Sequence, residues 1–99
     1  MTERLRFFDQ AAEEVEEAAA WYGKRSGVAR IAFLSEIDRA IDSILDAPSR
    51  WPIHLENTRR FVCRTFPYTV VYFVEGDTVF VAAVAHEKRR PGYWRDRLP

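Results

Sequence analysis

The sequence predicts an α+β domain with two layers, in which an antiparallel helical hairpin packs on a small antiparallel sheet. Apolar residues recur at helical spacing between residues 9 and 47, and from residue 59 onward they form short runs rich in β-branched and aromatic residues. A strand-like run precedes the helices, so the predicted order is β-α-α-β-β-β. Because the hairpin and the strands each have an apolar face, packing them together buries both.

Length and composition predict one globular domain. The chain has 99 residues, 47% of them hydrophobic and 30% charged, and we expect residues 1–99 to form a single domain. The opening MTERLRFFDQ lacks the apolar core of a signal peptide, and no apolar run approaches the ~20 residues that span a membrane. The one cysteine, Cys63, cannot form an intrachain disulfide. We therefore expect a cytoplasmic protein without membrane contact.

The first helix is expected to follow a short N-terminal strand, residues 3–8, which joins the sheet. Asp9 can accept free backbone N–H groups of a first helical turn, so we expect it to cap this helix, and Gly23 or Gly27 can end it. The predicted apolar face comprises Ala11, Val15, Ala18, Ala19 and Tyr22. The clustered glutamates, Glu13, Glu14, Glu16 and Glu17, are expected to form the solvated face.

The second helix is predicted from Val28 to Ala47, ended by Pro48. The linker between the helices is short, which favours an antiparallel hairpin. The predicted buried stripe comprises Ile31, Leu34, Ile37, Ile41, Ile44 and Leu45. The following residues, APSRWPIHLENT, contain two prolines and few periodic positions, so we expect a loop.

Three strands are predicted after this loop. RRFVCRTF is strand-like and is interrupted by Pro67, and YTVVYFVE is rich in β-branched and aromatic residues. Gly76-Asp77 is a two-residue hairpin signal before TVFVAAVAH. Because this last run is apolar almost throughout, we expect it to be covered on both faces or to lie at the centre of the sheet.

The charges are divided unevenly along the chain. Residues 1–50 contain ten acidic and seven basic residues, whereas residues 51–99 contain five acidic and eight basic ones. The basic excess follows the predicted strands, so the guanidinium groups can converge on phosphate or carboxylate if the strands are close neighbours. The alternative is a solvated basic surface. The candidates for binding a target are Arg59, Arg60, Arg64, Lys88 and Trp94.

RNA cleavage is one chemistry that this composition permits. It needs a base, an acid and positive charge on the phosphate, and the candidate catalytic residues are His86, Arg89, Arg90 and Tyr93. Tyr93 and Trp94 can stack on a base or simply cover the sheet edge. His54, His86 and Cys63 show no ligand spacing, and we expect neither a metal nor a cofactor. Cys63 is expected to be a small buried hydrophobe.

The ordered set of motifs resembles the ParE/RelE superfamily of bacterial toxins from type II toxin–antitoxin systems. The resemblance runs through AAEEVEEAAAWY, FLSEIDRAIDSILDAPSRWP and RRFVCRTFPYTVVYFVEGDTVFVAAVAHEKRRPGYWRDR, nearly the whole chain. It implies a helical hairpin on a small antiparallel sheet. It also implies a toxin of a plasmid-stabilisation type, neutralised by a cognate antitoxin that lays an extended or helical segment across it, with oligomers possible through that complex.

The resemblance implies one of two activities. RelE-like members cleave mRNA in the ribosome, using an arginine in the strand that here reads YTVVY, a basic residue near the end and a C-terminal tyrosine. These positions match Thr69, Glu87 and Tyr93, so two of the three differ. ParE-like members act on DNA gyrase, and the ending of this chain looks more like theirs. The favoured expectation is a non-enzymatic gyrase inhibitor; the alternatives are a metal-independent mRNA endoribonuclease and a binding module without toxicity.

Overall fold

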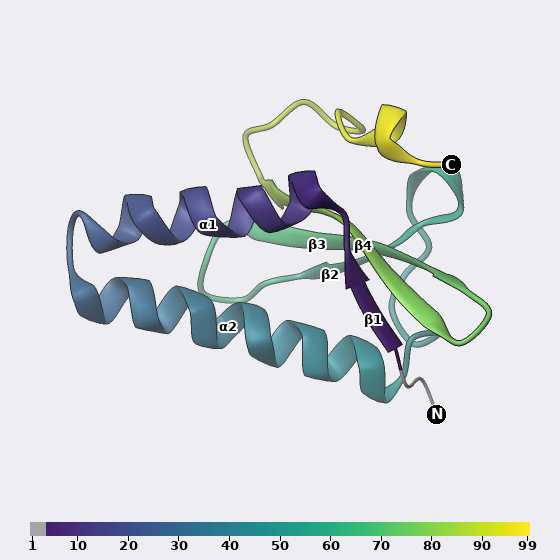
Figure 1. Cartoon of the computed structure of the whole chain (residues 1–99), viewed down its shortest axis with the longest axis horizontal. Helices are drawn as coiled ribbons and strands as arrows, with labels where there is room; N and C mark the ends of the chain where they lie inside the picture. The colour runs from purple at the N-terminus through teal and green to yellow at the C-terminus, as the bar shows by residue number, and fades with distance from the viewer. Residues whose placement is uncertain (1–3) are drawn as a thin grey trace.

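The computed structural model describes residues 4–99, and its elements follow the predicted order (Figure 1). The elements are β1 (Arg4–Phe7), α1 (Asp9–Gly23), α2 (Gly27–Asp46), η1 (Leu55–Asn57), β2 (Arg59–Val62), β3 (Tyr68–Glu75), β4 (Thr78–His86) and η2 (Arg95–Arg97). Glu3, which was expected in the first strand, lies outside the described residues. The predicted α+β fold class is confirmed. No helix within residues 4–99 is long and apolar enough to cross a bilayer.

The four strands form one sheet in the order β1-β4-β3-β2, so β4 lies inside the sheet, as its apolar sequence predicted. β3 pairs antiparallel with β2 and β4, but β1 pairs parallel with β4. The sheet is therefore mixed, and the expectation of a purely antiparallel sheet is wrong for this one pairing. The reason is topological. The helical hairpin returns the chain to the end at which β1 began, and a meander of three strands then makes β4 parallel to β1.

The β3–β4 hairpin has the predicted bounds. Gly76 adopts a left-handed φ of 61° in its turn, a conformation that glycine tolerates. β2 is shorter than the predicted strand-like run, because pairing with β3 ends at Val62 and the chain turns at residues 64–67. Cys63 lies just after β2 and is buried. Burial and the charge of Glu36 raise the pKa of the Cys63 thiol to about 11, which agrees with a packing role.

The outer edge of β4 is only partly covered by β1. The four residues of β1 pair with Thr78–Val81, and Phe8 N–H donates to Val81 O at 2.9 Å. Ala82 is an extra residue in the β3–β4 ladder, because Val81 and Ala83 pair with consecutive residues of β3. β4 then continues to His86, and within residues 4–99 no strand pairs with this edge beyond Val81. Its free backbone groups beyond Val81 therefore need other partners.

The helix starts differ from each other. Ser26 caps α2, because its Oγ accepts hydrogen bonds from Val28 N–H and Ala29 N–H. Asp9 is the first residue of α1 and not its cap, so that expectation is wrong. Phe8 occupies the cap position in an extended conformation without a side-chain hydrogen bond, because β1 runs directly into the helix.

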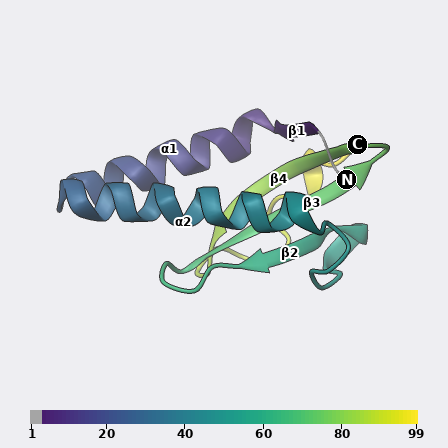
Figure 2. The same cartoon turned by 90° about the horizontal axis from the view of Figure 1, so that it is seen from below.

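The helices bury most of their predicted faces against the sheet. In α2, Ile37, Ile41 and Ile44 are buried, but Ile31 is 64% exposed and does not belong to the buried stripe. Ile31 lies near the start of α2, where the hairpin extends beyond the sheet (Figure 2). Phe33 takes the inward position there and stacks on Tyr22 with ring centroids 5.2 Å apart. The other predicted positions, Leu34 and Leu45, are half-buried.

The opposite face of the sheet is covered by the C-terminal segment, residues 87–99, which crosses it on the side away from α2 (Figure 1). Trp94 is 2% exposed and packs with Val71 and Ala83 in a second, smaller core. Tyr93 and Leu98 border this core. The segment therefore has a packing role on one face of the sheet.

Glu36 of α2 holds the loop between β2 and β3. Its Oε2 accepts hydrogen bonds from Thr65 N–H at 2.7 Å and from Phe66 N–H at 3.4 Å. Burial opposes the charge of this carboxylate, but the backbone donors outweigh burial and lower its pKa below the ordinary value of 4.5. The Glu36 carboxylate therefore holds the β2–β3 loop against α2 through two hydrogen bonds.

The substitution Glu36→Gln should lower the free energy of unfolding by about 1 kcal/mol at pH 7, because the charged acceptor is lost. Because the folded pKa of Glu36 lies below the unfolded value of about 4.5, its contribution to stability is present above the unfolded pKa and is lost as the pH falls through the lower folded pKa. Chemical denaturation across this range measures the difference between wild type and variant. The exposed Glu16→Gln is the matched control, and an equal, pH-independent effect of both variants would contradict the role of Glu36.

Candidate functional site

The basic residues of β2 and of the C-terminal segment do not form one cluster. β3 lies between β2 and β4, so the two sets are not on neighbouring strands. Arg59 Nη1 donates to Trp51 O at 2.6 Å, which makes it part of the loop's structure. Arg60 is exposed. The pKa of His54 is lowered mainly by burial of its ring and, to a smaller extent, by the positive charge of Arg60. The C-terminal ends of β2 and β4 lie at the same end of the sheet. Of these three arginines, only Arg64 follows β2 at that end.

The three positions matched to the RelE-like nucleases line two adjoining depressions, which share Pro67 and Tyr68. Thr69 and Glu87 line a shallow depression of about 300 Å³ together with Arg64. Tyr93 lines a different cleft, between α1 and the end of β4.

A buried ion pair between Glu14 and Arg97 lies beside this second cleft. Arg97 Nη2 donates to Glu14 Oε2 at 3.0 Å, with side chains only 15% and 12% exposed. The pair supplies partners for the open edge of β4: Val84 N–H donates to Glu14 Oε1 at 2.9 Å, and Arg97 Nη1 donates to Ala82 O at 3.0 Å. Tyr93 O–H donates to Glu14 Oε2 at 2.5 Å. We call Glu14, Tyr93, Arg97 and their two backbone partners the clasp.

The clasp is charged and hydrogen-bonded throughout. Burial opposes the charge of Arg97, but the Glu14 carboxylate outweighs burial and raises the Arg97 pKa. Burial and the hydrogen bond to Glu14 raise the pKa of Tyr93 well above its ordinary value. A phenol with a raised pKa is a weaker general acid, and its O–H is already engaged as a hydrogen-bond donor to a carboxylate. This geometry does not favour Tyr93 as the acid of an RNA-cleaving site.

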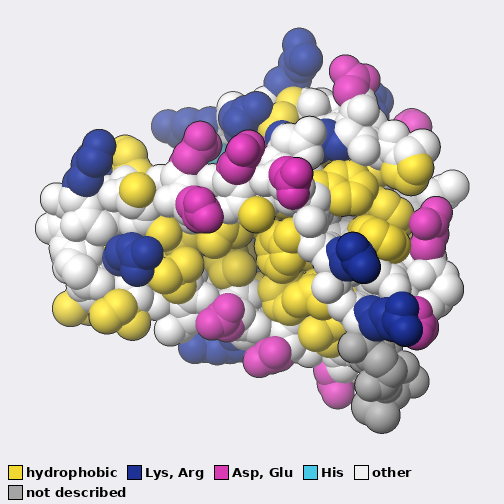
Figure 3. All heavy atoms as spheres, in the orientation of Figure 1, with side chains coloured by type: hydrophobic (Ala, Val, Ile, Leu, Met, Phe, Trp, Pro, Cys, Tyr) yellow, Lys and Arg dark blue, Asp and Glu magenta, His cyan; other side chains and the backbone are white. Residues whose placement is uncertain are grey.

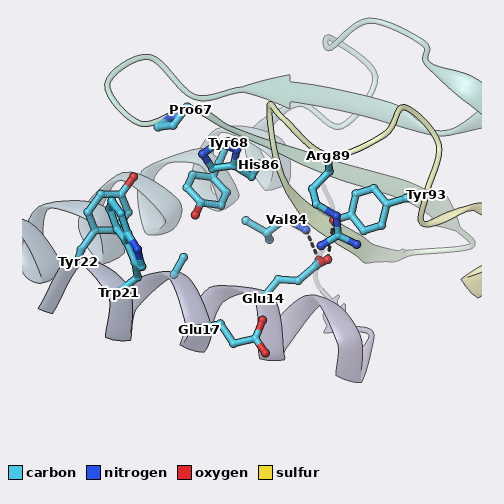
Figure 4. Close-up of a pocket in the computed structure, with 11 residues that line it drawn as sticks. Glu14, Glu17, Trp21, Tyr22, Pro67, Tyr68, Val84, His86, Arg89 and Tyr93 are labelled. Carbon is cyan, nitrogen blue, oxygen red and sulfur yellow. Dashed lines mark hydrogen bonds between the residues drawn. The ribbon is translucent and has the colours of Figure 1, made fainter. Parts of the chain in front are cut away.

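The cleft next to the clasp, here called the α1–β4 cleft, has a volume of about 560 Å³ (Figure 4). One wall is α1, and the other is formed by the start of β3, the end of β4 and the C-terminal segment. Its lining is mainly aromatic and charged: Glu14, Glu17, Ala18, Trp21, Tyr22, Pro67, Tyr68, Val84, His86, Arg89 and Tyr93.

Two of the predicted catalytic candidates, His86 and Arg89, meet in this cleft. The Arg89 guanidinium lies 3.8 Å from the centroid of the Tyr93 ring. The His86 ring stands edge-on to Tyr68 at 5.1 Å, and its Nδ1 accepts a hydrogen bond from Lys88 N–H. Both side chains are therefore held against aromatic rings.

The remaining candidates have other surroundings. Trp94 is buried against one face of the sheet and not at its edge, and as packed it does not present a face for stacking. The side chains of Lys88 and Arg90 are exposed, outside the lining of the cleft. Within residues 4–99 no group of three His, Cys, Asp or Glu side chains is arranged to hold a metal ion.

The sequence interpretation missed Glu14 and Arg97. Glu14 was expected on the solvated face of the first helix and is instead in the clasp, which corrects that expectation. Its spacing contained a signal, because Glu14 follows the buried Ala11 by three residues and precedes the buried Ala18 by four. Arg97 had no such signal, because its partner is 83 residues away in the chain. Trp21, Tyr22 and Tyr68 were likewise not recognised as cleft residues.

Two comparisons with known proteins gave matches. Residues 5–91 match the model of a family described as the ParE toxin of the type II toxin–antitoxin system parDE. The fold is similar to a solved chain of the chromosomal ParDE toxin–antitoxin system from P. aeruginosa, with a TM-score of 0.74 and 12% sequence identity, covering 86% of this chain and 96% of that one. A search of curated proteins found no match.

The clasp makes a direct prediction about stability. Glu14→Gln leaves an amide oxygen for Val84 N–H but removes the charge that Arg97 needs, so it should lower the free energy of unfolding by about 2–3 kcal/mol. Urea denaturation at pH 7 measures this, with Glu13→Gln as the control on the exposed face. Equal effects of the two substitutions would show that the ion pair is not a major source of stability.

Proposed function

The chain belongs to the ParE toxin family of type II toxin–antitoxin systems, and from this premise we propose that it arrests growth by acting on DNA gyrase until a cognate antitoxin neutralises it. We propose that residues 1–99 form one toxin domain that acts in the cytoplasm, where this target lies. The family match over residues 5–91 is the observation that carries the proposal.

The surroundings of Tyr93 favour a protein target over mRNA cleavage. The phenol O–H donates a hydrogen bond to Glu14, and burial together with this hydrogen bond raises the pKa of the phenol. Thr69 and Glu87 stand where a nuclease would have positive charge, and Glu87 would repel a phosphate. His86 and Arg89 remain together in the cleft, so the ribosome-dependent endoribonuclease is kept as the second candidate.

The antitoxin is proposed to bind an apolar groove between the two helices and β1. Figure 3 shows this face as a hydrophobic band with acidic side chains along both sides. The carboxylates at the rim favour an antitoxin segment with an apolar stripe flanked by Lys or Arg. The groove of about 660 Å³ is lined by Leu5, Phe7, Ala12, Val15, Glu16, Leu34, Ile37, Asp38, Ile41 and Asp42.

Induction of the chain in a bacterial host without its antitoxin should stop growth, and co-expression of the antitoxin encoded by the adjacent reading frame should restore it. During arrest, reporter plasmids should lose negative supercoiling or show double-strand breaks while transcripts stay intact by primer extension. Cleaved transcripts with normal supercoiling would reject gyrase in favour of the endoribonuclease. Antitoxin binding without arrest at confirmed expression would favour the non-toxic binding module.

The substitution Asp42→Lys at the groove rim should weaken antitoxin binding at least about tenfold, because it places like charges together. Isothermal titration calorimetry against the antitoxin measures the loss, and Asp46→Lys on the same helix, outside the groove lining, is the control. The Asp42→Lys variant should stay toxic alone and be poorly rescued. Unchanged affinity would place the antitoxin elsewhere.

A further inference from the structure

The two walls of the α1–β4 cleft differ in their chemistry. Trp21 and Tyr22 of α1 provide aromatic surface, and Trp21 is 51% exposed although it is large and apolar. Glu17, on the same wall, provides an exposed carboxylate. The facing wall provides hydrogen-bond donors, namely the Tyr68 hydroxyl, His86 and Arg89 (Figure 4). A ligand that fits the cleft has an apolar part and an acidic part.

The donors on the second wall are held in place before any ligand arrives. Arg89 lies over the Tyr93 ring, and the Tyr93 hydroxyl is fixed by Glu14 of the clasp. His86 uses Nδ1 to accept Lys88 N–H, so its Nε2 is the nitrogen left for a ligand within the described hydrogen bonds. A guanidinium restrained on a ring loses less rotamer freedom when it binds a carboxylate.

The aromatic wall is also restrained. The Arg25 guanidinium lies 3.5 Å from the centroid of the Trp21 ring, and Trp21 stands edge-on to Tyr22 at 5.0 Å. Tyr22 packs in turn on the buried Phe33. An exposed indole that is held by its neighbours has the character of an anchor in a protein–protein interface.

The charges of α1 argue against a nucleic acid in the cleft. A phosphate backbone that reaches Arg89 would also meet the exposed carboxylate of Glu17 in the lining of the cleft. A peptide with one carboxylate can pair with Arg89 without bringing further negative charge to Glu17. The mixed walls therefore suit a protein segment better than RNA.

We propose that the α1–β4 cleft binds a segment of the toxin's target protein, with an acidic side chain of that segment at Arg89 and His86 and an aromatic side chain against Trp21 and Tyr22. This rests on the proposed function, in which the toxin acts on a protein. The antitoxin groove uses other residues of α1, Ala12, Val15 and Glu16, so the two surfaces can be altered separately.

The cleft can be tested with short probes and the full chain. The probes are the blocked peptides acetyl-Trp-Gly-Glu-amide and acetyl-Trp-Gly-Lys-amide and a uridine hexanucleotide, titrated by NMR. The acidic peptide should bind with a Kd of about 1 mM and at least about fivefold more tightly than either other probe. Arg89→Gln should remove this preference, whereas Arg95→Gln, in the same segment but outside the cleft, should keep it. Tighter binding of the hexanucleotide, or equal binding of both peptides, would overturn the proposal.

A toxicity assay in cells distinguishes failure of this proposal from failure of the proposed function. Arg89→Gln and Trp21→Ala should each reduce toxicity at least about tenfold, measured as surviving colonies after induction, while antitoxin affinity stays within twofold of wild type. Full toxicity in both variants would overturn the cleft as the target site. If the wild type itself is not toxic, the proposed function fails, and the peptide titration still decides whether the cleft binds acidic segments.

Discussion

The Glu14–Arg97 pair supplies hydrogen-bond partners to the part of β4 that β1 is too short to reach. β1 pairs with only the first four residues of β4, and the β-bulge at Ala82 breaks the ladder on the other side. Ala82 O and Val84 N–H would then be unpaired backbone groups at two buried residues, which costs free energy. Arg97 and Glu14 satisfy them with charged groups and neutralise each other. One interaction thus joins α1, the central strand and the C-terminal segment.

The same interaction shapes the surface that the proposed function uses. Glu14 fixes the Tyr93 hydroxyl, and the Tyr93 ring supports Arg89 at the edge of the α1–β4 cleft. The sequence alone is compatible with catalysis by Tyr93 and Arg89, but in the structure the Tyr93 hydroxyl is bound to Glu14 and its ring supports Arg89. The antitoxin groove lies on other residues of α1, so one helix separates the two proposed binding surfaces.

Sequence reasoning predicted the features that depend on local pattern. The bounds of β3 and β4 follow from runs of β-branched residues around Gly76-Asp77, and the hairpin of helices follows from apolar spacing. Sequence reasoning was wrong where tertiary contacts determine the position or role of a residue. Ile31 fits the helical period, but no sheet lies beneath it, and Asp9 is a good cap residue in a place where the strand already supplies the start of the helix. The Glu14–Arg97 pair joins opposite ends of the chain, so no local pattern could reveal it.

The amide hydrogen of Val84 reports the clasp most directly, because its acceptor is the side chain of Glu14 and not a strand. Native-state hydrogen exchange followed by NMR at neutral pH can compare it with the amides of β4 that pair with β1 or β3. If the clasp is a fixed part of the fold, Val84 N–H should exchange only with the slow, cooperative opening of the sheet. Exchange of Val84 at the rate of an exposed amide, while its neighbours in β4 stay protected, would contradict this account.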